Sequence, residues 1–227
     1  MTLAVRATAE ELMDADDLDL ANYTHVVHDL AKVNTITMAR RPTIDFLKSL
    51  KAKQLRILDV GYGDGDMLRA IRRWADKAGV RIDLVGIDLN PRSAIAARSD
   101  TPDALNIDFR TGDYADLADE PWDVIISSLV AHHMTPAQLV AFIRFMDAHA
   151  KRGWFINDLH RHAFAYYGYP LLATLMRWHP IVRHDGRLSI ARSYRPAEWP
   201  AILQEAGVSC ATVSRKFPFR LCVSKIQ

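Results

Sequence analysis

Apolar and polar positions follow two different rhythms along this chain, and the change falls near residue 55. Before that point, apolar residues such as Val26, Leu30 and Val33 recur at helical intervals, which predicts helices. Residues 41–53 have the pattern of a further helix. We therefore expect the first fifty residues to be helical, while the rest of the chain mixes strands and helices.

Beyond residue 55, short apolar runs alternate with amphipathic stretches. The runs that predict strands are 55–60, 81–89, 105–113, 122–130, 153–158, 209–215 and 219–226. Helices are expected at 66–79, 91–99, from 136 onward and at about 196–207. This alternation predicts an α/β fold, a doubly wound and mostly parallel seven-stranded sheet with helices on both faces.

Two helical regions carry local signals of their own. Thr135 and Gln138 form a capping box around Pro136, which marks a helix start. Residues 162–178 predict two helical pieces that are broken at Gly168, Tyr169 and Pro170.

Composition narrows the class of protein. Of 227 residues, 49% are hydrophobic and 25% are charged, with a net charge of +2, as in a soluble globular protein. The sequence lacks the basic stripe that would indicate a nucleic-acid partner. The first residues lack a signal-peptide pattern and no apolar run approaches ~18 residues, so we expect a cytoplasmic protein without a membrane span. Cys210 and Cys222 do not suggest a disulfide framework.

Residues 57–68, ILDVGYGDGDML, form a strand–glycine–helix junction that is typical of a nucleotide-like ligand site. The small and acidic positions of this junction are Asp59, Gly61, Gly63, Asp64, Gly65 and Asp66. In a dinucleotide fingerprint the third small residue would fall on Asp66, whose carboxylate would repel a pyrophosphate. The junction therefore argues against a dehydrogenase and favours a ligand with positive groups and no phosphates.

Four motifs occur in order, each at a predicted strand end: ILDVGYGDG, VGIDLNP, FRTGDYADL and WDVIISSLVAHHM. With these motifs, residues 54–227 resemble the class I S-adenosylmethionine-dependent methyltransferases. The resemblance implies a Rossmann-like fold and an enzyme with S-adenosyl-L-methionine as cofactor and S-adenosyl-L-homocysteine as product. It also implies a domain at 54–227, preceded by an N-terminal helical extension at 1–53.

The resemblance assigns roles around the cofactor. Asp88 would accept the ribose hydroxyls and Asp59 would support the methionine amino group. Asp113 would accept the adenine amine, with Tyr114 beside the ring. The full set of expected cofactor-binding residues is Asp59, Gly61, Gly63, Gly65, Asp88, Leu89, Asp113, Tyr114, Ser128 and Leu129.

Histidines follow the fourth and fifth strands, whose ends face the active-site mouth in this fold. A histidine suits a general base that removes an acceptor proton near neutral pH. His133 and His160 are the leading candidates, and His132 is a third. No metal site is expected, because the histidine pairs come without a convincing set of carboxylates.

An apolar and aromatic insert at about 160–195 and the N-terminal helices are expected to form the acceptor pocket. The expected substrate-binding residues are Tyr23, Met38, Arg161, Tyr166 and Tyr169. Such a pocket suits a small hydrophobic or phenolic molecule, with O-methylation favoured over C-methylation. The pattern also resembles bacterial relatives of the ubiquinone/menaquinone methyltransferase group, some of which serve polyketide or phenolic secondary metabolism.

Two alternatives remain open. An N-methyltransferase that acts on nucleic acid would usually carry an Asn/Asp-Pro-Pro-Tyr/Phe box where residues 127–130 read Ser-Ser-Leu-Val. The same alternative includes an N-methyltransferase that acts on protein. The other alternative is a non-catalytic module that binds S-adenosylmethionine. As partners we expect a small-molecule acceptor and no nucleic acid, with the protein a monomer or a homodimer.

Overall fold

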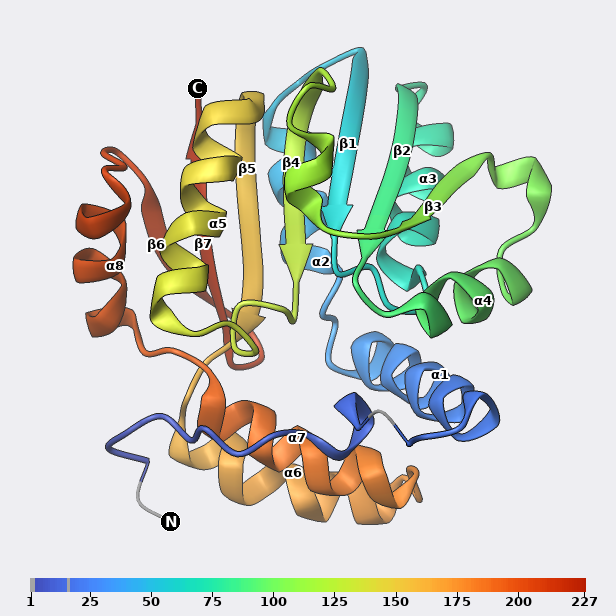
Figure 1. Ribbon diagram of the computed structural model, residues 1–227, viewed down its shortest axis with the longest axis vertical. Coiled ribbons are helices and arrows are strands. Elements are labelled where there is room, and N and C mark those ends of the chain that lie inside the picture. The colour runs from blue at the N-terminus through green and yellow to red at the C-terminus, as the bar shows by residue number, and fades with distance from the viewer. Residues whose placement is uncertain (1–2, 16) are drawn as a thin grey trace.

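The computed structural model, which describes residues 3–15 and 17–227, contains a seven-stranded sheet with helices on both faces (Figure 1). The strands are β1 (Gln54–Val60), β2 (Arg81–Asp88), β3 (Ile107–Thr111), β4 (Trp122–Ser128), β5 (Ala150–Leu159), β6 (Thr212–Lys216) and β7 (Arg220–Ile226). The helices are α1 (Leu20–Ile36), α2 (Arg41–Ser49), α3 (Asp66–Ala78), α4 (Pro91–Ser99), α5 (Pro136–His149), α6 (Ala163–Leu175), α7 (Pro180–Arg192) and α8 (Trp199–Ala206). Short 3₁₀ turns are η1 (Leu12–Asp14), η2 (Asp103–Leu105), η3 (Tyr114–Leu117) and η4 (Pro196–Glu198).

The strand order is β3-β2-β1-β4-β5-β7-β6, and β7 runs antiparallel to its neighbours β5 and β6. The strands β1 to β5 are parallel to one another. β1 lies between β2 and β4, with Val60 in register with Ile87 and Ser127. The chain therefore reverses its winding direction at the carboxyl end of β1, which is where ligands bind in such sheets. The predicted fold class is confirmed.

Each face of the sheet is covered by its own apolar layer. On one face α5 and α8 bury Trp122, Trp154 and Trp199. On the other, α2 and α3 bury Phe46 and Leu68. The capping box at Thr135 is present as predicted, with the Thr135 side chain accepting from the backbone N–H of Gln138. These layers hold the sheet rigidly, so that its carboxyl edge is a fixed platform.

The prediction of two broken helical pieces at 162–178 is wrong. α6 is a single helix with Pro170 inside it, and the chain breaks later, between the end of α6 and Pro180. Pro170 lacks a backbone N–H, but the loss of one hydrogen bond does not end a helix that packs along α7. The chain turns after α6 at Arg177, which has a φ of 54°. α7 was not predicted, because its sequence is largely polar. Neither α6 nor any other described helix has the length and hydropathy that a membrane span needs.

The helices α1, α6 and α7 form a cover layer beyond the carboxyl ends of the parallel strands (Figure 1). The N-terminal segment 3–15, which we call the strap, runs along α7 (Figure 1). The expectation that it is helical is wrong, because only η1 is helical and the rest of the segment bonds to α7 and has no helix of its own. The Ala7 N–H donates to the Ala191 carbonyl at 3.0 Å. The buried Asp185 carboxylate of α7 accepts the backbone N–H groups of Leu12 at 3.0 Å and Met13 at 2.9 Å. Side chains of the strap are thereby held over the sheet edge.

We expect Asp185→Ala to loosen the strap. Two backbone N–H groups would lose a carboxylate acceptor, and hydrogen bonds to charged groups contribute about 1.5–3 kcal/mol each. Amide hydrogen exchange at Leu12 and Met13 should accelerate while β1 and β4 keep their protection. Asp45→Ala, at an exposed position of α2, is the control. Unchanged exchange in the strap would show that Asp185 does not hold it.

Candidate active site

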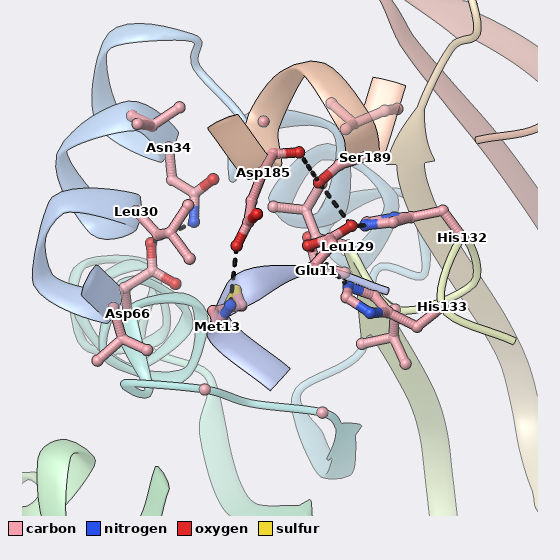
Figure 2. A pocket seen from close by; sticks show the side chains of 18 of the residues that line it. Glu11, Met13, Leu30, Asn34, Asp66, Leu129, His132, His133, Asp185 and Ser189 are labelled. Atoms are coloured by element: carbon pink, nitrogen blue, oxygen red, sulfur yellow. Dashed lines mark hydrogen bonds and ion pairs between the residues drawn. The ribbon is translucent and has the colours of Figure 1, made fainter. Parts of the chain in front are cut away.

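A cavity of about 670 Å³ lies between the carboxyl edge of the sheet and the cover layer. Its wall combines the glycine loop after β1, the ends of β2 and β4, α1, the strap, α6 and α7 (Figure 2). The single cavity thus reaches both the predicted cofactor residues and the histidine pair after β4.

The glycine loop approaches its neighbours closely at one position and leaves space at another. A Cβ on Gly61 would lie 2.3 Å from the Val130 side chain, so only glycine fits there. Gly63 has φ of +58°, and a Cβ at this position would meet nothing within 4 Å. Gly63 lines the cavity, so this open space is cavity space. The loop backbone can therefore contact a ligand directly.

Asp88, at the end of β2, holds the glycine loop. Its Oδ2 accepts the Gly63 N–H at 3.0 Å and its Oδ1 accepts the Asn90 N–H at 2.9 Å. Burial raises the pKa of Asp88, while these hydrogen bonds act to lower it. Each oxygen accepts one backbone N–H and keeps lone-pair capacity for a ligand hydroxyl.

Asp59, near the end of β1, is a buried carboxyl group without a partner. Its exposure is 1%, and neither carboxylate oxygen has a hydrogen-bond partner among the described residues. Burial raises the pKa of Asp59 well above its ordinary value, and the charges of Asp66 and Asp88 add to the shift. Because Asp59 also lines the cavity, a cationic group bound there would supply the missing counter-charge.

Most of the cofactor residues expected from the sequence line the cavity: Asp59, Gly61, Gly63, Asp88, Leu89, Tyr114, Ser128 and Leu129. Asp113 and Gly65 do not. Asp113 is exposed and caps η3, where it accepts the Ala115 N–H at 2.9 Å. Gly65 packs against Phe109, 2.7 Å from where a Cβ would lie, so it shapes the start of α3 instead of the wall.

His132 is buried and fixed by Asp158 from β5. Its Nδ1 lies 2.7 Å from Asp158 Oδ1, and its backbone N–H donates to Asp158 Oδ2 at 2.8 Å. Burial acts to raise the pKa of Asp158, but the attraction to His132 and its hydrogen bonds outweigh this and lower it. An ionised carboxylate only accepts, so Nδ1 carries a proton, and in the neutral form of the imidazole the free lone pair then lies on Nε2.

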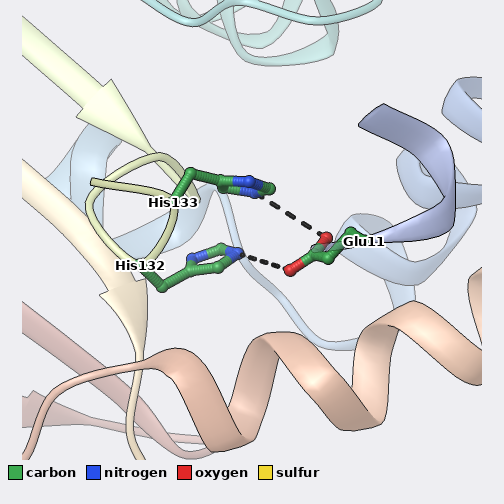
Figure 3. Close-up of side chains that lie close together, drawn as sticks. All are labelled: Glu11, His132 and His133. Atoms are coloured by element: carbon green, nitrogen blue, oxygen red, sulfur yellow. Dashed lines mark ion pairs between the residues drawn. The ribbon is translucent and has the colours of Figure 1, made fainter. Parts of the chain in front are cut away.

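The strap brings two carboxylates, Glu11 and Asp14, to the histidine pair, and Figure 3 shows Glu11 between the two imidazoles. Glu11 Oε1 lies 3.6 Å from His132 Nε2, and Glu11 Oε2 lies 3.8 Å from His133 Nε2. The Nδ1 atom of His133 lies 3.1 Å from Asp14 Oδ2. Burial raises the pKa of Glu11 to about 7, although the nearby His133 acts to lower it. The polar end of the cavity is thus assembled from the strap and the segment after β4.

His160 does not line the cavity, so the structure does not support it as the base. The chain turns away after β5, where the His160 N–H donates to the Phe219 carbonyl at 2.9 Å. Its ring packs against His162 with ring centroids 5.3 Å apart. Burial lowers the pKa of His160, and the neighbouring His162 adds to this.

Of the expected substrate residues, Tyr23 and Tyr169 line the cavity, whereas Met38, Arg161 and Tyr166 do not. Met38 lies beyond the end of α1 and is 38% exposed. Arg161 is buried and bonded to the Leu3 and Ser193 carbonyls. Tyr166 is buried among strap and α7 residues. These three residues have structural contacts that the sequence pattern does not reveal.

Sequence reasoning missed Glu11, Asp14 and Asp158 as site residues. Asp158 carried a signal, because it ends a predicted strand beside the one that precedes His132. Glu11 and Asp14 carried none, because they stand in an acidic stretch that resembles any solvated segment. Only the path of the strap over α7 brings them to the cavity.

Residues 57–153 match the family model described as a methyltransferase domain. Among curated proteins, no sequence matches this chain. Human N-acetylserotonin methyltransferase, solved with S-adenosylmethionine, aligns with a TM-score of 0.63 and 13% identity, over 92% of this chain and 56% of that one. A methyltransferase from Aquifex aeolicus that depends on S-adenosylmethionine aligns with a TM-score of 0.64 and 17% identity, over 92% of this chain and 99% of that one.

A plantazolicin methyltransferase, solved with S-adenosylhomocysteine and a triazolic desmethylplantazolicin analog, aligns with a TM-score of 0.62 and 17% identity, over 84% of this chain and 71% of that one. The methyltransferase fold is therefore confirmed. The matched domain and the cofactors bound in these neighbours agree with the predicted enzyme and with S-adenosylmethionine as its cofactor.

We expect Asp59→Asn to stabilise the cofactor-free protein. The folded-state pKa of Asp59 is raised, so folding binds protons. The stability cost of ionising Asp59 is absent below the unfolded pKa of about 3.9 and grows as the pH rises towards the folded value. The melting temperature should therefore increase more at pH 8 than at pH 4, as measured by calorimetry.

Asp76→Asn, on the exposed face of α3, is the isosteric control and should leave both melting temperatures unchanged. The same Asp59→Asn variant should bind S-adenosylmethionine at least ~10-fold more weakly, because a charge-assisted contact is worth about 1.5–3 kcal/mol. A lower melting temperature at pH 8 would refute the idea that Asp59 is an uncompensated charge.

Proposed function

We propose that the protein transfers the methyl group of S-adenosylmethionine to a small hydrophobic or phenolic acceptor, preferentially to oxygen. One observation carries this proposal. A single cavity joins an unpartnered buried carboxyl group under a glycine loop to a carboxylate-oriented histidine pair. The first feature suits the cationic cofactor and the second suits an acceptor that must lose a proton.

The residues present fit the cofactor. Asp59 would pair with the ammonium of the methionine moiety, and Asp88 would accept the ribose hydroxyls with its remaining lone pairs. The open space at Gly63 would admit the ligand against the loop backbone. Bound there, S-adenosylmethionine supplies a methyl group on a positively charged sulfur.

The cavity wall between the glycine loop and the histidine pair is mainly apolar, and we assign this part to the acceptor. The Tyr169 hydroxyl already donates to the Val182 carbonyl at 2.8 Å, and the Tyr23 hydroxyl bonds Ser93 at 2.7 Å. Both tyrosines therefore offer ring surface and no free hydroxyl. Leu172 and Val182 extend this surface. Such a wall favours a flat apolar body whose single polar group faces His132 and His133.

Methyl transfer is an in-line displacement, so the enzyme must align the nucleophile and help to remove its proton. Alignment can contribute about 7–11 kcal/mol to lowering the barrier. We place the deprotonation of the acceptor at the His132 and His133 end of the cavity, whose imidazoles are held by Asp158 and Asp14. The cover layer, with the N-terminal extension and the insert at 160–195, would exclude water as an acceptor lid.

The proposal also covers the location of the protein, its subgroup, its oligomeric state and its partners. We place the protein in the cytoplasm, among bacterial relatives of the ubiquinone/menaquinone methyltransferases that serve secondary metabolism, as a monomer or homodimer that binds no nucleic acid. A peptide amine is the second candidate acceptor, since the polar end of the cavity is rich in acids that would attract a cationic group. C-methylation of a phenolic ring is compatible with the same wall.

The function is tested in two steps. Calorimetry should show S-adenosylmethionine and S-adenosylhomocysteine binding at one site, with no binding of NADH. Radiolabelled methyl transfer is then measured on a panel of phenols, with a peptide amine and an RNA as comparison substrates. Transfer to the phenols alone supports the proposal. Transfer to the peptide or RNA alone, or no cofactor binding, refutes it.

We expect Gly63→Ala to weaken cofactor binding through its position and not through strain. Gly63 and Gly79 have similar left-handed backbones, with φ of +58° and +65°, and open space around a built Cβ. Alanine at either position should therefore cost about 1 kcal/mol of stability. Only Gly63 lines the cavity, so only Gly63→Ala should weaken S-adenosylmethionine binding ~10-fold or more by calorimetry. Equal affinities for the two variants would contradict the site.

A further inference from the structure

The two histidines at the polar end of the cavity share one hydrogen-bonding pattern. Each imidazole has a carboxylate at Nδ1, Asp158 at 2.7 Å for His132 and Asp14 at 3.1 Å for His133. Each directs its Nε2 towards the same residue, Glu11 (Figure 3). A carboxylate behind Nδ1 fixes the tautomer in which Nε2 has a free lone pair, as metal-ligating histidines require.

The separations around Glu11 exceed those of hydrogen bonds. Glu11 Oε1 lies 3.6 Å from His132 Nε2, and Oε2 lies 3.8 Å from His133 Nε2. One ligand atom from each residue lies within 4.8 Å of the others. Ligands around tetrahedral zinc, with bonds of about 2.0–2.1 Å, are about 3.4 Å apart. The two separations from Glu11 to the histidines are therefore a few tenths of an ångström wider than a shared cation requires, and small side-chain movements would bring the three ligand atoms onto one ion.

From this geometry we propose that Glu11, His132 and His133 form a binding site for a divalent cation of the zinc type. Two imidazole nitrogens and one carboxylate are a common catalytic zinc set, which leaves a further coordination position open. The carboxylates of Glu11, Asp14 and Asp158 surround the histidine pair. A divalent cation bound between them would offset their negative charge.

The backbone of the pair is also held in place. The Arg192 guanidinium donates to the carbonyls of His132 and His133 at 3.3 Å each, and Arg6 donates to the His132 carbonyl at 3.1 Å. Ser189 donates to Glu11 Oε1 at 2.9 Å, which fixes the third ligand from α7. All three side chains line the cavity, so the open coordination position faces the acceptor.

The role of the cation rests on the proposed function, whereas the site itself does not. An acceptor hydroxyl bound to the cation would lose its proton to solvent and remain as an oxyanion. Its electron pair forms the new bond to the methyl carbon while the carbon–sulfur bond breaks. The sulfur of S-adenosylhomocysteine keeps the electron pair of the broken carbon–sulfur bond. The cation thus holds the nucleophile in place and stabilises its charge until it reacts.

The experiment uses the full chain after removal of metal with a chelator. Zn²⁺ is titrated by calorimetry, and Co²⁺ is added as a spectroscopic probe whose visible absorption reports nitrogen and oxygen ligation. We expect one Zn²⁺ per chain and Co²⁺ bands of a low-coordinate site. Glu11→Gln should weaken Zn²⁺ binding ~100-fold and abolish these bands. Glu10→Gln, at the exposed neighbouring position, should change neither.

Circular dichroism and S-adenosylmethionine calorimetry on both variants establish that the fold and the cofactor side are intact. Unchanged Zn²⁺ affinity in Glu11→Gln overturns the proposed cation site, and full methyl transfer by metal-free protein overturns the role given to the cation. The proposed function stands in both cases. Loss of Zn²⁺ binding in Glu11→Gln with normal cofactor binding supports the proposed cation site. A cation site without methyl transfer to any phenol supports the site and refutes the proposed acceptor class.

Discussion

The cost of burying carboxylates beside a cavity governs the design of this protein. The acids in the cavity wall and directly behind it meet that cost in different ways. Asp88 is satisfied by backbone N–H groups, and Asp158 by the imidazole and backbone of His132. Asp59 is satisfied by nothing among the described residues. The rigid sheet and its two apolar layers supply the stability that such uncompensated charge consumes.

The two halves of the cavity are built on different principles. The cofactor half comes from turns that directly follow β1, β2 and β4, so each side chain is placed by a strand that ends beside it. The acceptor half joins segments far apart in sequence, since Glu11 and His132 meet only through the path of the strap along α7. The first half depends on local geometry and the second on tertiary packing.

That difference decides what the sequence could reveal. Alternating apolar runs and the capping box at Thr135 are local signals, and they predicted the sheet. The family resemblance, which rests on four motifs at strand ends, implied the cofactor residues, most of which line the cavity. Asp113 shows the limit of such signals, because an acid after a strand can equally cap the next turn. His160 shows another limit. It follows a strand end as His132 does, but its hydrogen bond to Phe219 turns the chain away. Pro170 suggested a break that packing against α7 overrides.

The strap and the helices α6 and α7 contribute no strand to the sheet, although they contribute much of the acceptor wall. Substitutions in these segments can therefore accumulate without disturbing strand register or the glycine loop. Changes on the proposed acceptor side would therefore cost folding little, whereas changes on the proposed cofactor side would act on the strand ends themselves. A fold of this kind separates the part that must stay constant from the part that is free to diversify.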